Sequence, residues 1–186
     1  MNVKKGAPDP RKLVYSALFM AIGLLLPFVT GQIPQIGKML SPMHIPVFLC
    51  GFLCGWQYGG AVGFVTPLLR SALFGMPALY PSAVGMAFEL AAYGMVSGWL
   101  YARFQKKRPA AVYAVLIIAM LAGRAVWGLV SVALYGIAGN RFTVAMFLAG
   151  AFVNAVPGIV LHLLLIPPVV MALEKVMPRP AAERSA

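Results

Sequence analysis

Three charged residues interrupt the apolar runs of this sequence, namely Arg70, Glu89 and Arg124. A charged side chain inside a long apolar segment is costly to bury and usually marks a site that binds or moves a polar molecule. Two arginines face one carboxylate, so one positive charge is left over and predicts an anionic partner. The alternative is that Glu89 pairs with one arginine only to hold the helices together.

A histidine opens one of the apolar runs. His44 stands between Pro42 and Pro46, and prolines suit the first turn of a helix, where the missing N–H groups cost little. The residue is predicted at the outer end of this helix. There it either touches water and lipid headgroups or lies at the mouth of a polar pocket, near an organic substrate.

Three more side chains accompany the charged ones. Trp127 follows Arg124 by one helical turn and is positioned to contact the apolar part of a substrate. Asn154 is predicted at a depth similar to that of Arg124. His162 is predicted deeper, toward the cytoplasm, between helix breaks expected at Pro157 and at residues 167–168.

Enzymatic and metal-binding signatures are weak. The stretch GQIPQIGKML resembles a phosphate-binding loop, but it has five residues between its glycines instead of four. Its lysine, Lys38, is followed by methionine, where a magnesium-binding Ser or Thr belongs. We therefore expect no nucleotide hydrolysis by this chain. The two His and two Cys show no spacing typical of a tetrahedral metal site, so neither a metal nor a cofactor is predicted.

The composition is that of an integral membrane protein. The chain is 61% hydrophobic and 10% charged, whereas soluble domains carry about 25% charged residues. A net charge of +11 does not indicate nucleic acid binding, because most of the basic residues fall in three clusters outside the apolar runs. These clusters are residues 4–12, 103–108 and 175–184.

Apolar length predicts an all-α bundle of six membrane-spanning helices, since one span needs about 20 apolar residues. The predicted spans are Arg11–Val29, Pro42–Tyr58, Gly60–Gly75, Ser82–Tyr101, Ala111–Gly136 and Thr143–Leu173. A turn at Gly59–Gly60 separates the second from the third, and reading these two as one would give five spans.

Six spans are favoured by the charges, because they place all three basic clusters on one side, and cytoplasmic loops carry the excess of Lys and Arg. Both termini are then cytoplasmic, in a cell-membrane protein. Residues 1–10 form an N-terminal segment, residues 11–173 the membrane domain and residues 174–186 a basic tail.

Small residues recur at helical spacing. Glycines follow one another every fourth residue from Gly51 to Gly63, and Ala17 and Ala21 form a similar ridge in the first helix. Such ridges allow helices to approach closely, either within the bundle or between subunits.

With the ALFMA ridge in its first helix and the run MHIPVFLCGFLCGWQYGGAVGFVTPLLRSALFG, the chain resembles the substrate-binding S component of an energy-coupling factor (ECF) transporter. The resemblance covers nearly the whole length. It implies a subunit that binds a vitamin or related micronutrient at the outer side. Its partners would be a transmembrane coupling subunit and two cytoplasmic ATPases, and Ala17 and Ala21 would face the coupling subunit. The pocket would lie among the external loops and helices four to six, with Glu89, Arg124 and Asn154.

One branch of the family that the chain resembles binds nickel or cobalt with an N-terminal Met-His. Here Met43-His44 is internal and has no free amine, so a metal substrate is not expected. We predict that Arg124, Glu89, Asn154, Arg70, Trp127 and His44 contact a small vitamin or precursor with an acidic group, for example a molecule like pantothenate. The alternative is a self-sufficient secondary carrier or channel that uses Glu89 or His162, and a membrane enzyme ranks third.

Overall fold

The computed structural model describes residues 9–29, 40–104 and 109–176, and within these ranges it contains helices and no strand. The prediction of an all-α fold is therefore confirmed. The main helices are α1 (Pro10–Val29), α3 (His44–Cys54), α4 (Trp56–Phe74), α5 (Val84–Ala102), α6 (Pro109–Ile137) and α8 (Val156–Val176). A π-helical turn, η1 (Leu79–Ala83), leads into α5, and the short α7 (Val144–Leu148) and η2 (Ala149–Val153) precede α8.

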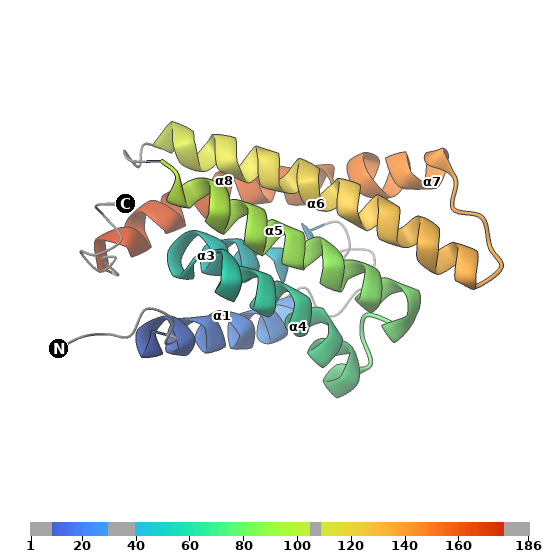
Figure 1. Cartoon of the computed structure of the whole chain (residues 1–186), viewed down its shortest axis with the longest axis horizontal. Coiled ribbons are helices and arrows are strands. Elements are labelled where there is room, and N and C mark those ends of the chain that lie inside the picture. Colours follow the sequence, from blue (N-terminus) through green and yellow to red (C-terminus); the bar gives the residue numbers. More distant parts are fainter. Residues whose placement is uncertain (1–8, 30–39, 105–108, 177–186) are drawn as a thin grey trace.

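The long helices alternate in direction along the bundle (Figure 1). The start of α1, the end of α5 and the end of α8 all lie at the same end of the molecule. Four segments are long and apolar enough to cross a membrane: Pro10–Val29, Leu79–Ala102, Pro109–Ile137 and Val144–Val176. The 11 residues of α3 cover only about 16 Å at 1.5 Å per residue, so α3 alone is too short to span a bilayer. Six crossings therefore stay a prediction.

The turn between the second and third predicted spans lies elsewhere than expected. Gly55 has a φ of 100° and separates α3 from α4, whereas Gly59 and Gly60 lie inside α4. The predicted turn at Gly59–Gly60 is therefore wrong. The left-handed region of φ strongly favours glycine, and four glycines stand close together here, so the sequence did not reveal which of them makes the turn.

The last predicted span is interrupted, but at a different place from the one expected. The helical path breaks at residues 154–155, and α8 then runs unbroken through Pro157, Pro167 and Pro168. The breaks predicted at these prolines are therefore wrong. Pro157 lies in the first turn of α8, where its missing N–H has no helical partner to lose, and prolines within membrane helices are tolerated when neighbouring groups satisfy the freed carbonyls.

Glycines bring α3, α4 and α5 into backbone contact. A Cβ atom added to Gly59 of α4 would lie 2.6 Å from the Cα atom of Gly51 and 2.7 Å from the carbonyl oxygen of Gly94. Both neighbours are backbone atoms and cannot rotate away. The small-residue spacing noted in the sequence thus allows these three helices to pack closely.

We expect Gly59→Ala to lower the free energy of unfolding by about 2 kcal/mol or more, because the three helices must separate to admit one methyl group. Thermal unfolding in detergent measures this loss. Gly136→Ala in α6 is the matched control, since its Cβ would meet nothing within 4 Å, and it should leave the melting temperature unchanged or slightly higher. Equal melting temperatures for the two variants would contradict the packing described here.

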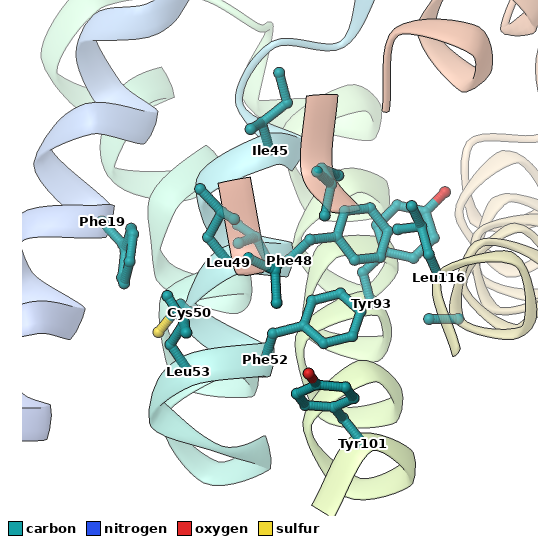
Figure 2. Close-up of a cluster of buried hydrophobic side chains, with 14 of the residues drawn as sticks. Phe19, Ile45, Phe48, Leu49, Cys50, Phe52, Leu53, Tyr93, Tyr101 and Leu116 are labelled. Atoms are coloured by element: carbon teal, nitrogen blue, oxygen red, sulfur yellow. The ribbon is translucent and has the colours of Figure 1, made fainter. Parts of the chain in front are cut away.

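A column of aromatic side chains fills the space between α3 and α5 (Figure 2). Phe48 stacks on Tyr93 with ring centroids 4.8 Å apart, and Phe52 meets the edge of Tyr101 at 4.9 Å. These residues recur every fourth or eighth position along each helix, so they share one face. His44 lies one turn before Phe48 and Glu89 one turn before Tyr93, which places a polar group from each helix at the same end of the column.

Candidate functional site

A buried polar cluster lies at this end of the aromatic column, with members from four helices. It consists of His44 at the start of α3, Glu89 and Tyr93 on α5, Arg124 on α6 and His162 on α8. The side chains of His44 and Glu89 are each 3% exposed, and that of Arg124 is 13% exposed. The cluster is therefore enclosed by the bundle.

Glu89 is the centre of this cluster. Its Oε1 atom lies 2.8 Å from Nη1 of Arg124 and accepts a hydrogen bond of 2.7 Å from the Tyr93 hydroxyl. Nε2 of His44 is 4.0 Å from the same oxygen. A buried carboxylate is stable only when it is paired and hydrogen-bonded, and Arg124 and Tyr93 meet that requirement.

Three polar atoms of the cluster are buried without a hydrogen-bond partner. They are Nδ1 and Nε2 of His44 and Nε of Arg124. Each such atom costs about 1–3 kcal/mol relative to a hydrogen-bonded one, so a native protein rarely keeps three of them together without a role. They offer hydrogen bonds to a molecule that enters the cluster.

His162 connects the cluster to the segment before α3. Its ring stacks on that of His44, with centroids 5.8 Å apart and planes inclined by 27°. Its Nε2 atom is 3.4 Å from the carbonyl oxygen of Ser41. Because a carbonyl can only accept, Nε2 must carry the proton. Ser41 has a φ of 45°, which is rare for a residue with a side chain, and its carbonyl also accepts the backbone N–H of His44.

Local sequence explains how Arg124 and Tyr93 reach Glu89. Glu89 and Tyr93 are four residues apart on α5, so they are neighbours on one face. Gly123 precedes Arg124 on α6, and a Cβ atom there would collide with the Tyr93 ring. The glycine thus lets α6 approach α5 closely enough for the ion pair to form.

The structure brings three of the six predicted substrate contacts together, namely Arg124, Glu89 and His44. The expectation that His44 touches water and headgroups is wrong, because the residue is 2% exposed and packs against His162 and Tyr93. The bundle covers it because α8 crosses the start of α3, a contact that the sequence does not show.

Trp127 lies beside the cluster. Its ring packs on Phe142 and Phe147, with centroids 5.7 and 6.1 Å away, and it would be 3.6 Å from a Cβ atom at Gly85. Gly85 is one turn before Glu89, so Trp127 forms an apolar wall one turn from the ion pair, toward the start of α5. Asn154, by contrast, is exposed at the break before α8, because the chain leaves its helical path there.

Arg70 is also outside the cluster. Although it is only 3% exposed, its Nη1 atom donates to the carbonyl oxygen of Leu24 on α1. The guanidinium lies 4.9 Å from the ring centre of Phe28 and 5.4 Å from that of Phe74. The surplus positive charge predicted from the sequence is therefore used to join α1 to α4.

We expect Arg70→Gln to lower the free energy of unfolding by about 1–3 kcal/mol, because it removes a hydrogen bond and two contacts of a cation with aromatic rings. Substrate affinity should change by less than about twofold, since the cluster is untouched. Thermal unfolding and equilibrium binding measure the two effects, and Arg141→Gln in the exposed loop before α7 is the control. If the Arg70→Gln protein is stable but binds the substrate much more weakly, Arg70 contacts the substrate, as first predicted from the sequence.

Ala17 and Ala21 are both exposed on α1. The buried side of this helix is formed by Ser16, Phe19, Gly23 and Pro27, which face α3 and α4. The two alanines lie on the other side, so their ridge is not used for packing within the described bundle.

One residue of the cluster was missed by sequence reasoning, and another was misplaced. Tyr93 carried a usable signal, namely its spacing of four from Glu89. His162 was noted, but at another depth and without a partner. Within the described residues, no group of three or more His, Cys, Asp or Glu side chains is arranged to hold a metal ion.

Long apolar helices around an enclosed, charge-paired polar cluster define a membrane-embedded protein with an internal polar site, as in carriers and membrane-bound binding proteins. A family model identifies the class further: the ECF transporter substrate-specific component matches residues 11–170. The chain belongs to this family. Comparisons with curated proteins and with solved structures gave no match.

Membership in this family defines the general role of the chain. Substrate-specific components of ECF transporters are transporter subunits and not enzymes, and this chain is a membrane-embedded, multi-pass member that determines which substrate is carried. The family implies a small-molecule substrate and an ECF module with ATPases as partners.

Proposed function

We propose that this subunit binds a small water-soluble vitamin or vitamin precursor that carries an acidic group, and that Arg124 binds the acid. The substrate then binds next to the Glu89–Arg124 pair. Trp127 provides the apolar wall for the rest of the molecule, and His44 provides a further hydrogen bond.

One observation supports this proposal above the others: the guanidinium of Arg124 is largely buried, and only part of it is used. Nη1 contacts Glu89, while Nε has no partner. A guanidinium has five N–H donors in a planar fork that matches a carboxylate or phosphate. Such charge-assisted hydrogen bonds are strong in a site that excludes water.

The basic residues support an orientation with both termini in the cytoplasm. Arg11 and Lys12 at the start of α1, Arg103 after α5 and Lys175 near the end of α8 lie at the same end of the bundle (Figure 1). Cytoplasmic ends of membrane helices carry the excess of Lys and Arg. The chain then crosses the cell membrane six times.

The first experiment is mass spectrometry of small molecules that copurify with the protein, followed by equilibrium binding of matched acid and neutral pairs. Suitable pairs are pantothenate and pantothenol, nicotinate and nicotinamide, and biotin and biotin amide. We expect one acid to bind at least about 100-fold more tightly than its neutral partner, which is about 2.7 kcal/mol. Binding of only neutral molecules, or of both partners equally, would contradict an acid-binding site.

A second function is favoured by one specific feature, the row of ionisable groups across the cluster. The His44 ring stacks on His162 and its Nε2 atom lies 4.0 Å from Glu89, so three groups able to carry a proton are adjacent. Such rows serve proton-driven carriers. Transport by this chain without ATPases would support that function.

A further inference from the structure

The acid-binding site described above is already neutral before any substrate arrives. Glu89 compensates Arg124 at 2.8 Å, and Arg70, the other arginine within the apolar helices, is held between Phe28 and Phe74. An entering carboxylate would leave the enclosed cluster with one net negative charge. An uncompensated charge in a low-dielectric interior is very unfavourable, so a second positive charge is needed when the acid binds.

We propose that His44 supplies this charge and is thereby the residue that makes the site specific for an acid: it takes up one proton from water as the anionic substrate binds. This inference rests on the proposed function, since it concerns the same site and its acidic substrate. A neutral analogue brings no charge into the site, so no proton is taken up when it binds. It therefore cannot gain from the imidazolium.

The position of His44 makes it the proton acceptor. Both ring nitrogens are buried without a partner, so the ring is neutral in the empty site, where an imidazolium would leave two N–H donors unsatisfied. Charged groups face it from α5 (Glu89) and α6 (Arg124), and the other titratable groups near it are Tyr93 and His162. On α1, the residue beside Met43 and Pro46 is Gly23, which carries no charge. On α4, the guanidinium of Arg70 donates to the carbonyl of Leu24 on α1.

The neighbouring groups are less suited to gain a proton. Glu89 already accepts from Arg124 and Tyr93, and both contacts favour its carboxylate form. Tyr93 donates its hydroxyl proton and has none to gain. Among the described residues, no carboxylate lies within 4.0 Å of the His162 ring nitrogens, whereas His44 has Glu89 at that distance, and Nε2–H of His162 is directed at the Ser41 carbonyl. His162 is therefore a positioning residue, which holds the Ser41–His44 segment in place.

The proton balance is simple. One proton leaves water or buffer outside, an N–H bond forms on the imidazole of His44, and no bond of the substrate breaks. The resulting imidazolium has two donors, and a small shift brings Oε1 of Glu89, 4.0 Å from Nε2, into hydrogen-bond range. When the substrate leaves, the proton returns to water.

Isothermal titration of the full chain in detergent tests this inference, with the acid of the panel above that binds and its neutral partner. The observed binding enthalpy in buffers of different ionisation enthalpy gives the number of protons taken up. We expect about one proton for the acid and none for the neutral analogue. The dissociation constant of the acid should rise about tenfold per pH unit between about pH 6 and about pH 8, because across this range His44 is neutral in the empty site and protonated in the complex.

Two variants assign the proton. In His44→Gln, uptake should fall from about one proton to about zero, and the affinity at about pH 6 should fall at least tenfold. In Glu89→Gln, Arg124 is no longer compensated, so the acid should bind without proton uptake and with an affinity that does not change with pH. If His44 served folding alone, the Glu89→Gln variant would still show an affinity for the acid that changes with pH.

Three results would overturn the inference. An acid that binds without proton uptake refutes it and leaves the proposed function standing. Uptake that persists in His44→Gln places the proton on another group, with Glu89 the nearest. Failure of every acid in the panel to bind overturns the proposed function and this inference with it.

Discussion

Replacing Arg124 with alanine is expected to weaken binding of the acidic substrate by at least about 100-fold. The variant removes the fork that binds the acid and leaves Glu89 buried beside Tyr93 with no cation. Truncating one partner of a buried charge pair costs about 2–5 kcal/mol or more, and part of that loss reflects the unpaired partner. Equilibrium binding of the purified protein measures the effect.

Two further variants separate binding from folding. Arg124→Met combined with Glu89→Gln removes both charges of the pair, so it should fold about as well as the original chain and still fail to bind the acid. Arg124→Lys keeps the charge and loses the planar fork, and it should bind at an intermediate level. A folded double variant with unchanged affinity would show that the pair only joins α5 to α6.

Placing tryptophan at Ala17 or Ala21 is expected to abolish substrate uptake in cells and leave binding to the isolated subunit unchanged. Both alanines are exposed on the side of α1 that faces away from α3 and α4, and a close crossing with another helix requires small side chains there. Tyr93, a member of the cluster, lies on the other side of α3 from Phe19 of α1 (Figure 2). Uptake assays and copurification of the coupling subunit measure the first effect, and equilibrium binding measures the second.

The control for this prediction is Ala133→Trp, which changes an exposed alanine on α6. It adds the same bulk at an exposed position on another helix and should leave both uptake and binding intact. Normal uptake by Ala17→Trp would exclude α1 as the docking surface. Simultaneous loss of binding in that variant would mean that the ridge supports the bundle itself.

Sequence reasoning was most successful for features encoded within one helix. α1 follows directly from the long apolar run after Lys12, and the close packing of α4 follows from regularly spaced glycines. Pairing of Glu89 with an arginine was one of two alternatives considered. Each of these depends on residues a few positions apart, for which helical geometry alone is informative.

Features that depend on contacts between distant segments could not be predicted in the same way. Either arginine had a comparable chance of meeting Glu89, and the choice of Arg124 depends on how α6 is rotated against α5. The stacking of His162 on His44 depends on the register of α8, which is set by a break at residues 154–155 and not by the prolines. No local pattern identifies that break, because residues 149–153 remain helical up to it.

Reconstitution into liposomes tests most directly the central claim that this chain is the substrate-binding subunit of an ATP-driven importer. The substrate identified by copurification is offered to liposomes that contain the chain alone, or the chain with the coupling subunit and the two ATPases, with and without ATP. We predict that the chain alone binds the substrate but does not accumulate it, and that accumulation requires both the module and ATP. Accumulation by the chain alone under a pH gradient would contradict this account and identify a proton-driven carrier.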